Sequence, residues 1–276
     1  METSRAVLVT GCSSGIGRAS ALALVRAGLP TWASARDTAA LTELEAEGCR
    51  VLRLDVTDEE SRVRAVRAVE AEHGVVGALV NNAGYAQVGP VEEVPLEALR
   101  RQFETNVFGL VRLCQLVLPG MRAQRSGTIV NLGSGAGLVT PPASSAYAMT
   151  KYALESLSDA LRLETRAFGI RVALLEPGAV RTGFVSALTA TTPRGDSPGP
   201  YDTLMRNAIA LAERDGNSDR SLAPEDVARA VVHAVTSRRA RTRYRIGSQA
   251  RLAPPVRRAL GDRLWDRLLE QVCPTQ

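Results

Sequence analysis

Short apolar segments alternate with helix-period segments along most of the chain, and this alternation limits the possible folds most strictly. Six apolar segments predict strands at Ala6–Thr10, Thr31–Ala35, Arg50–Leu54, Ala78–Val80, Gly127–Leu132 and Ile170–Leu175. Helical patterns lie between them, near residues 16–28, 38–47, 59–73, 96–118 and 145–167. Because the strands lack regular polar–apolar alternation, helices are expected to cover both faces of the sheet. We therefore predict a single α/β domain with a doubly wound parallel sheet in three α/β/α layers.

The pattern changes after Pro177. Residues 183–220 are rich in Gly, Pro and Thr and include a helical stretch near 202–214, which predicts a loop that contacts the substrate. A helix is expected at 223–235 and a last strand at 243–247. An amphipathic helix broken at Gly261 is indicated by apolar residues every four positions, at Leu252, Val256, Leu260, Leu264, Leu268 and Val272. We expect a catalytic domain at 1–250 and a basic helical extension at 251–276.

The net charge of +5 lies in the C-terminal segment. Residues 238–276 contain ten arginines and three acidic residues, whereas residues 1–237 contain 24 basic and 26 acidic ones. Only Tyr244 and Trp265 accompany these arginines, so no nucleic-acid surface with aromatic stacking is expected. A solvated arginine surface is the simplest interpretation. Docking onto an acidic carrier protein or an anionic lipid is the alternative.

The sequence shows no sign of membrane insertion, disulfides or metal binding. No apolar run approaches the roughly 18 residues that span a bilayer, and residues 1–10 lack a signal-peptide pattern, so we expect a cytoplasmic protein. His73 and His233 are interpreted as structural, the first at a helix end and the second within a helix. Free thiols are expected because no paired spacing relates Cys12, Cys49, Cys114 and Cys273.

Residues 10–17, TGCSSGIG, match two different motifs. One is G-x-S-x-G, the nucleophile turn of α/β-hydrolases, with Ser13 as the nucleophile; such a turn follows several strands and needs a later catalytic histidine. The other uses Gly11, Gly15 and Gly17 as a turn that brings a pyrophosphate to a helix N-terminus. Since one strand precedes Ser13 and both histidines have structural interpretations, the second motif is preferred.

Lys151 is the only lysine in the chain and follows Tyr147 by four positions. Residues four apart lie on one face of a helix, so the ammonium and the phenol are expected to be neighbours. A tyrosine titrates at about pH 10, and a nearby positive charge lowers its pKa. Lysine suits this task because it is a compact charge with three donors, unlike the planar fork of arginine. The pair therefore predicts a tyrosine that exchanges protons at neutral pH.

Taken together, these segments resemble the short-chain dehydrogenase/reductase family. The family's motifs recur in order as TGCSSGIG (10–17), LDV (54–56), NNAG (81–84), NVFG (106–109), Ser134 in NLGSGAG, YAMTK (147–151) and EPGAVRT (176–182). The resemblance covers roughly residues 4–185, and TGCSSGIG, SARD and RYRIG are similar to the hydroxysteroid and retinol dehydrogenase branch. It implies a Rossmann-type fold and a nicotinamide-dependent interconversion of a carbonyl and an alcohol.

The resemblance also implies the roles of individual residues. Tyr147 would be the general acid in reduction and the base in oxidation, and Ser134 would hydrogen-bond the substrate oxygen. Lys151 would lower the pKa of Tyr147 and bind the nicotinamide ribose, and Asn106 would position a water that links Lys151 to solvent. The cofactor would contact Gly11, Ser13, Ser14, Gly15, Ile16 and Gly17 at the pyrophosphate and adenosine, Asp55 and Val56 at the adenine, Asn82 with Ala83 and Gly84 near the adenine ribose, and Tyr147, Lys151, Pro177, Gly178, Val180 and Thr182 at the nicotinamide.

The end of the second strand selects the cofactor in such folds, through an acidic residue for NAD or an arginine for NADP. Asp37 lies about twenty residues after Gly17, which by itself indicates NAD. In the resemblance, however, the discriminating acidic position corresponds to Ala35, and Arg36 follows it. Asp37 then falls at the start of the next helix, where a capping role accounts for it. We therefore predict a preference for NADP(H), with NAD(H) as the alternative.

These observations predict an NADP(H)-dependent oxidoreductase that interconverts a ketone or aldehyde with an alcohol and takes a bulky, apolar small molecule. The alternatives are an NAD-dependent alcohol dehydrogenase of the same family and a noncatalytic NADP(H)-binding protein. A redox-neutral epimerase or dehydratase is not expected, because about 90 residues follow Thr182 and such enzymes need a longer substrate domain. Family members usually pair through the long helices that carry Asn106 and Tyr147, so a homodimer or homotetramer is expected.

Overall fold

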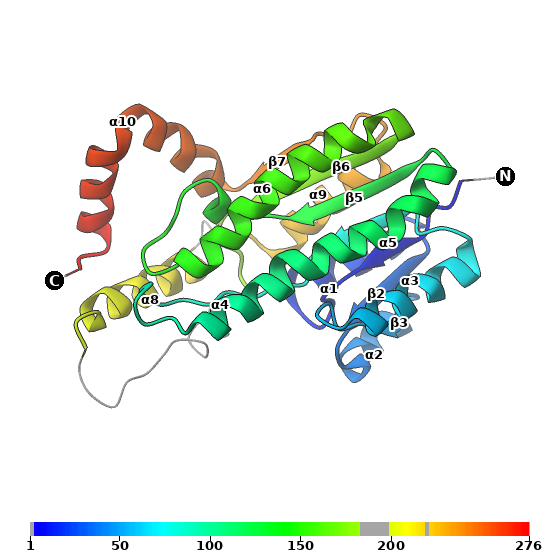
Figure 1. The fold of residues 1–276 in the computed structure, drawn as a ribbon, viewed down its shortest axis with the longest axis horizontal. Helices are drawn as coiled ribbons and strands as arrows, with labels where there is room; N and C mark the ends of the chain where they lie inside the picture. Colours follow the sequence, from blue (N-terminus) through cyan, green and yellow to red (C-terminus); the bar gives the residue numbers. More distant parts are fainter. Residues whose placement is uncertain (1–2, 183–198, 219–220, 276) are drawn as a thin grey trace.

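A sheet of seven parallel strands forms the centre of the computed structural model, which describes residues 3–182, 199–218 and 221–275 (Figure 1). The strands are β1 (Val7–Val9), β2 (Thr31–Ala35), β3 (Arg50–Arg53), β4 (Ala78–Asn81), β5 (Gly127–Leu132), β6 (Ile170–Pro177) and β7 (Arg243–Ile246). Their order is β3-β2-β1-β4-β5-β6-β7, and all neighbouring pairs are parallel. Because the direction of connection reverses between β1 and β4, a crevice is expected at their carboxyl ends. The predicted doubly wound sheet is confirmed.

Helices cover both faces of this sheet, which gives the predicted three layers (Figure 1). The first face is covered by α1 (Gly15–Arg26), α2 (Thr42–Ala46) and α9 (Pro224–Thr236), and the second by α3 (Glu59–His73), α5 (Gly109–Ala123) and α6 (Ser145–Thr165). In β1, Val7 and Val9 pack on the α1 side, whereas Leu8 packs on the α5 side. Leu8 lies opposite Leu79 of β4 in register, and both are fully buried. The inner strands β1 and β4 are mainly apolar because helices pack on both faces, whereas β3 and β7 at the sheet edges each carry two arginines.

The segment after β2 starts with a capped turn. The Asp37 carboxylate accepts a hydrogen bond from the Ala39 backbone N–H at 3.0 Å and caps a 3₁₀ turn, Thr38–Leu41. The capping interpretation of Asp37 is therefore confirmed. The helix predicted at 38–47 is shorter than expected, because this 3₁₀ turn precedes the five-residue α2.

The helix predicted at 96–118 is interrupted. It consists of α4 (Leu96–Phe103), a π-helical turn at Glu104–Phe108 and α5. The turn ends where the chain passes the strand-end loop that contains Val56, and a Cβ on Gly109 would lie 2.2 Å from the Val56 carbonyl oxygen. A wider helical turn, which shifts the following residues, is a common device at functional sites. Asn106 lies within this turn.

The C-terminal part contributes α8 (Asp202–Asn217), α9, β7 and α10 (Ser248–Val272). Pro224 occupies the first turn of α9, and Gly261, with φ 68° and ψ 171°, interrupts α10 as predicted. Figure 1 shows α10 bending toward α8, and the Asn207 side-chain amide donates to the Pro274 carbonyl at 2.7 Å. Residues 183–198 and 219–220 of the predicted substrate loop lie outside the described residues. The predicted boundary after residue 250 falls inside α10.

A buried ion cluster joins β7 to α6. Arg243 pairs with Glu155 at 3.1 Å, Asp159 at 2.8 Å and Glu176 at 3.2 Å, and Arg245 pairs with Glu176 at 3.1 Å. Glu176 is fully buried at the end of β6. Burial and the neighbouring Glu176 carboxylate raise the pKa of Glu155. This cluster holds the part of α6 that lies one turn beyond Lys151.

The cysteines and histidines have the structural roles that were predicted. All four cysteines are free and buried. His73 ends α3 before Gly74 and makes an edge contact with Trp32, while His233 Nδ1 lies 2.8 Å from the Tyr244 hydroxyl. Within the part of the chain that the structure describes, no His, Cys, Asp and Glu side chains group as a metal site, and no helix is long and apolar enough to cross a bilayer.

Candidate active site

The glycine-rich turn lies between β1 and α1. Gly11 (φ +71°) and Gly15 (φ +54°) have left-handed conformations that favour glycine, and a Cβ on Gly17 would lie 2.2 Å from the Gly11 carbonyl oxygen. Ser14 precedes α1 in an extended conformation, and its side chain does not cap the helix. The first N–H groups of α1 are thus left without a side-chain cap, and its first turn carries no acidic residue. This turn fits the pyrophosphate of a dinucleotide.

Asn82 braces the glycine-rich turn from the end of β4. Its side-chain amide donates to the carbonyls of Thr10 at 2.9 Å and Gly11 at 3.0 Å. The Thr10 hydroxyl in turn accepts hydrogen bonds from the backbone N–H groups of Asn82 and Ala83. Asn82 therefore fixes the turn and also lines the adjoining cavity. The sequence predicted only its contact with the cofactor.

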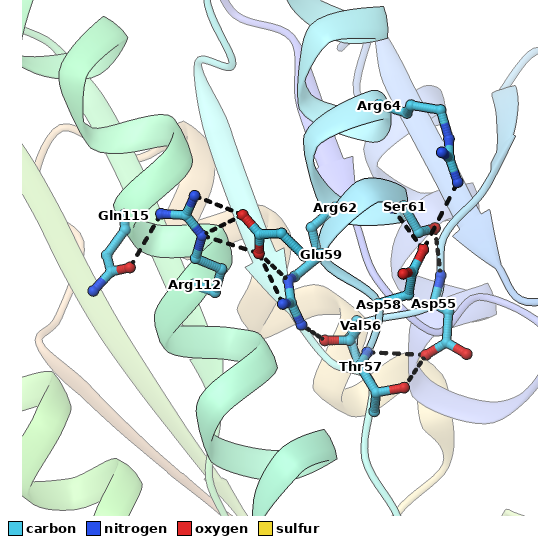
Figure 2. A network of polar contacts seen from close by, with 10 residues as sticks. All are labelled: Asp55, Val56, Thr57, Asp58, Glu59, Ser61, Arg62, Arg64, Arg112 and Gln115. Carbon is cyan, nitrogen blue, oxygen red and sulfur yellow. Dashed lines mark hydrogen bonds and ion pairs between the residues drawn. The ribbon is translucent and has the colours of Figure 1, made fainter.

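The predicted adenine end lies at the loop after β3, shown in Figure 2. The Asp55 carboxylate accepts from the Thr57 backbone N–H at 2.9 Å and the Thr57 hydroxyl at 2.7 Å. Burial by itself raises the pKa of Asp55. The two hydrogen bonds from Thr57 and the charges of Arg36 and Arg53 together lower it more, so this pKa lies below its ordinary value. Arg36 is exposed and lies near enough to Asp55 to act on it, which brings two predicted cofactor residues together.

An arginine–carboxylate network fixes the rest of this loop (Figure 2). Arg112 of α5 donates two hydrogen bonds to Glu59 Oε1, at 2.6 and 2.8 Å, and Arg62 donates to Glu59 Oε2 and to the Val56 carbonyl. Hydrogen bonds from Arg112 and Arg62 lower the pKa of Glu59 to about 2. The Val56 side chain is buried in the core on the α5 side, and its carbonyl is bonded to Arg62, so neither group is free for the predicted adenine contact.

A cavity of about 440 Å³ lies at the carboxyl ends of β4, β5 and β6. The structure brings ten predicted residues to its wall: Ile16, Asn82, Gly84, Ser134, Tyr147, Lys151, Pro177, Gly178, Val180 and Thr182. The other predicted residues do not line it: Gly11, Ser13, Ser14, Gly15, Gly17, Arg36, Asp55, Val56, Ala83 and Asn106. A Cβ on Gly15 would lie 3.0 Å from Thr182 Cγ2, so the glycine-rich turn adjoins the cavity. These positions fit an extended cofactor whose reactive end lies in the cavity.

Ser134 and Tyr147 meet inside the cavity. Ser134 follows β5 and its Oγ accepts a hydrogen bond from the Ala136 backbone N–H at 3.1 Å. Tyr147 lies in the first turn of α6 and is half-buried as a residue, with its phenol end enclosed. Burial raises the pKa of Tyr147 to about 12, although a hydrogen bond with Ser134 acts in the opposite direction. The predicted lowering of this pKa is therefore wrong for the resting site, where burial outweighs the other effects.

Lys151 lies beside Tyr147, as the four-residue spacing predicts. Its Nζ is 5.5 Å from the centre of the Tyr147 ring and donates to the Leu132 carbonyl at 2.7 Å. Burial lowers the pKa of Lys151 to about 8. The ammonium is thus close to its titration at mildly alkaline pH, and two of its three donors are left for other partners.

Asn106 contacts neither Lys151 nor the cavity. Its amide donates to the Tyr85 carbonyl at 2.9 Å and to the Thr150 hydroxyl at 3.1 Å, and its Oδ1 accepts from the Tyr85 N–H. The Thr150 hydroxyl then donates to the Tyr147 carbonyl at 2.7 Å. Asn106 is therefore tied to the first turn of α6, where Tyr147 lies.

The far side of the cavity comes from α8, which lies in the segment predicted to contact the substrate, and from α10, whose role the sequence did not reveal. Helix α8 lines it with Met205, Ala208, Ile209, Leu211, Ala212 and Asp215, and α10 lines it with Ala250, Ala253, Trp265 and Leu269. Trp265 is buried although it lies in the basic extension. Apolar periodicity indicated both helices, but their packing over the cavity depends on tertiary contacts that periodicity does not report. The extension is part of the cavity wall.

Comparisons with known proteins agree with this geometry. A family model described as short chain dehydrogenase matches residues 5–193. The chain is 35% identical over 275 residues to YusZ of Bacillus subtilis, an uncharacterized oxidoreductase, with 96% of each chain covered. It is 36% identical to human retinol dehydrogenase 8, covering 85% of this chain and 79% of the relative, and 32% identical to an NADPH-dependent 3-dehydrocapnine reductase of Ornithobacterium rhinotracheale, covering 96% and 95%.

Solved structures share the fold. A short-chain dehydrogenase from Streptomyces avermitilis has a TM-score of 0.81 at 35% identity, covering 97% of both chains. A short chain dehydrogenase/reductase from Burkholderia phymatum in complex with NAD has 0.79 at 28%, covering 98% and 97%, and a serine dehydrogenase complexed with NADP+ has 0.73 at 30%, covering 84% and 89%. Fold and site define a dinucleotide-binding oxidoreductase. The chain belongs to the short-chain dehydrogenase family, with retinol dehydrogenase-like relatives.

The uncapped start of α1 leads to a prediction about binding. Ser14→Asp adds a carboxylate that can cap α1, so the melting temperature without cofactor is expected to stay equal or rise. The same charge repels a pyrophosphate. Saturating NADPH at a hundred times its dissociation constant should stabilise the wild type by about 2.7 kcal/mol, or several degrees, and this rise should be lost in Ser14→Asp. Ser14→Ala is the control that keeps it; an undiminished rise in Ser14→Asp would place the pyrophosphate elsewhere.

Proposed function

We propose that the protein is an NADP(H)-dependent oxidoreductase that interconverts a bulky, apolar ketone or aldehyde with its alcohol. One observation supports this most directly: Ser134 and Tyr147 share a hydrogen bond at the wall of a cavity that adjoins the glycine-rich turn. A hydroxyl pair in that position can bind a carbonyl oxygen and exchange a proton with it. Pro177, Gly178, Val180 and Thr182, which line the same cavity, would hold the nicotinamide end of the cofactor.

When bound at this site, a nicotinamide cofactor would supply the hydride to the carbonyl carbon in reduction and accept it from the alcohol carbon in oxidation. Tyr147 donates its hydroxyl proton to the carbonyl oxygen in reduction and takes it back in oxidation. Ser134 Oγ already accepts the Ala136 N–H, so its own proton is available to the same oxygen and stabilises the developing alkoxide. The Lys151 ammonium, 5.5 Å from the Tyr147 ring, stabilises the phenolate left after proton transfer.

Asn106 acts as a positioning residue in this proposal. Its bonds to the Tyr85 backbone and to Thr150 connect the π-helical turn to the first turn of α6. Thr150 passes this connection to the backbone of Tyr147. Asn106 thereby fixes the position of the Tyr147 hydroxyl in the cavity. It acts through the backbone of α6 and does not contact the substrate.

The cavity wall supports a bulky, apolar substrate. Val139, Met205, Ile209, Trp265 and Leu269 contribute apolar side chains. Cavities of several hundred Å³ with a few polar groups are typical sites for small molecules of this kind. The similarity to human retinol dehydrogenase 8 supports the same substrate class.

Two features support NADP(H) over NAD(H). Arg36 is exposed at the end of β2, where an arginine accommodates a 2′-phosphate. Asp37, the acidic alternative, is already engaged in capping at Ala39. The similarity to the NADPH-dependent reductase of Ornithobacterium rhinotracheale supports this preference. The similar Burkholderia phymatum structure contains NAD and supports the alternative, NAD(H).

We also propose that the protein assembles through α5 and α6. These helices lie side by side on one face of the molecule (Figure 1). They expose large apolar side chains, with 53% of Phe108, 44% of Met149 and 69% of Leu163 accessible. Met149 and Leu163 lie fourteen residues apart, on the same face of α6. A second copy of the chain would cover this face.

The mechanism predicts how Lys151 shapes the pH profile. The ammonium, with a pKa of about 8, is present below that pH and lost above it, whereas Tyr147 stays protonated throughout. Steady-state kcat for ketone reduction should therefore fall above about pH 8. Lys151→Arg keeps its charge to higher pH, so this fall should disappear, while kcat at pH 7 drops at least about 100-fold because the guanidinium cannot take the same place. Wild-type turnover in Lys151→Arg would exclude Tyr147 and Lys151 as the catalytic pair.

Cofactor preference is tested at Arg36. Wild-type protein should show a larger rise in melting temperature with NADPH than with NADH at equal concentration. Arg36→Leu should lower the NADPH rise toward that of NADH, because the 2′-phosphate loses its cation. Arg53→Leu is the matched control, since Arg53 also acts on Asp55 but lies at the end of β3. A larger rise with NADH in the wild type would reverse the preference, and no rise with either would contradict the proposed function.

Assembly is tested by sedimentation velocity. The wild type should sediment as a dimer or tetramer, and Leu163→Asp should shift it toward smaller species because it places a charge on the covered face. Leu252→Asp, at an exposed leucine of α10, is the control and should leave the assembly unchanged. A monomeric wild type would exclude this interface.

A further inference from the structure

The cavity has one feature that carbonyl chemistry does not use. Among the described residues that line it, two carry a charge, Lys151 and Asp215. Lys151 belongs to the catalytic group and is bonded to the Leu132 carbonyl. Asp215 lies in the last turn of α8, among apolar neighbours that line the same cavity, such as Leu211 and Ala212.

No contact with another described residue explains the negative charge of Asp215. No ion pair or side-chain hydrogen bond joins its carboxylate to any residue within 3–182, 199–218 and 221–275; only its backbone carbonyl is used, by the Ser218 hydroxyl at 3.0 Å. A carboxylate in the last turn of a helix also faces the negative end of the helix dipole. Helix C-termini favour the opposite charge. The helix therefore gives no reason for a carboxylate at this position, and the cavity that it lines offers one.

A carboxylate in an apolar wall discriminates strongly between ligands. When an apolar substrate displaces water from it, the charge loses its hydration unless the ligand replaces it. A cationic group restores the loss through a charge-assisted hydrogen bond. A ligand carboxylate is repelled, and a hydroxyl compensates only in part.

From this geometry we propose that Asp215 binds the protonated amine of the substrate, so that the preferred substrates are apolar amino ketones and the corresponding amino alcohols. This inference rests on the proposed carbonyl–alcohol function, because it assigns a second contact to the substrate of the same cavity. Tyr147 and Ser134 bind the carbonyl end, and Asp215 on α8 fixes the orientation of the rest. Trp265 and Leu269 of α10 line the same cavity and would contact the apolar part of the substrate.

The test uses three matched series of alkyl ketones with NADPH. One carries a primary ammonium, one a hydroxyl and one a carboxylate, each placed two to six carbons from the carbonyl. In the wild type the best ammonium ketone should have a KM at least about tenfold below that of its hydroxyl counterpart, and the carboxylate series the highest KM. Asp215→Asn should raise KM for the ammonium ketone about tenfold and leave kcat within about twofold. KM for the hydroxyl series should stay equal or fall, because a charge that the hydroxyl compensates only in part has been removed.

Glu213→Gln, an exposed carboxylate on the same helix outside the cavity, is the matched control and should change nothing. Equal KM values for the ammonium and hydroxyl series, or an unchanged ammonium KM in Asp215→Asn, would overturn the inference while leaving the oxidoreductase function intact. If no ketone is turned over, the proposed function fails instead. Calorimetric titration of the ammonium and carboxylate ketones into wild type and Asp215→Asn then still decides whether Asp215 selects the cation.

Discussion

The contact between Gly17 and the Gly11 carbonyl oxygen is the constraint on which the rest of the site depends. A side chain at Gly17 would lie 2.2 Å from that oxygen and 2.4 Å from the Asn82 amide, so only glycine allows α1 to start this close to β1. The close start directs the uncapped end of α1 into the crevice between β1 and β4. Thr182, which follows β6, touches Gly15 from the other half of the sheet. The two halves of the site are thus joined at one turn.

Backbone contacts of the same kind hold the catalytic helix. A Cβ on Gly137 would lie 2.9 Å from the Lys151 carbonyl oxygen, so the 3₁₀ turn after Ser134 packs directly on α6. Asn106 binds the same helix through the hydroxyl of Thr150, which lies in α6 and donates to the Tyr147 carbonyl. Ser134 and Tyr147 come from segments thirteen residues apart in sequence, and their meeting depends on these contacts with α6. Ser134 and Tyr147, the proposed catalytic pair, are therefore positioned by close packing of main chain, which tolerates few substitutions.

The sequence predicted the strands, the doubly wound sheet and ten residues of the cavity wall, because these follow from short-range patterns and from motifs at strand ends. It did not predict the π-helical turn that carries Asn106, since that turn responds to the passage of Gly109 past Val56, a contact between distant segments. The part of the cavity wall that α10 contributes escaped prediction for the same reason. Trp265 lies in a segment that is exposed and basic on its other faces, and only the bend at Gly261 brings it to the cavity.

The pKa of Tyr147 depends on opposing effects, of which the sequence indicated only the neighbouring Lys151 charge. The burial that outweighs it could not be predicted. Spacing correctly placed Lys151 beside the phenol, yet burial favours the neutral form of both groups and raises one pKa while lowering the other. The attraction between them becomes large only when the phenol has lost its proton, because two opposite charges in an apolar cavity interact far more strongly than one charge and a neutral ring. In the proposed mechanism Lys151 would therefore act mainly on the state that follows proton transfer. Stabilisation of that kind lowers the barrier without lowering the resting pKa, which is what differential binding of the transition state requires.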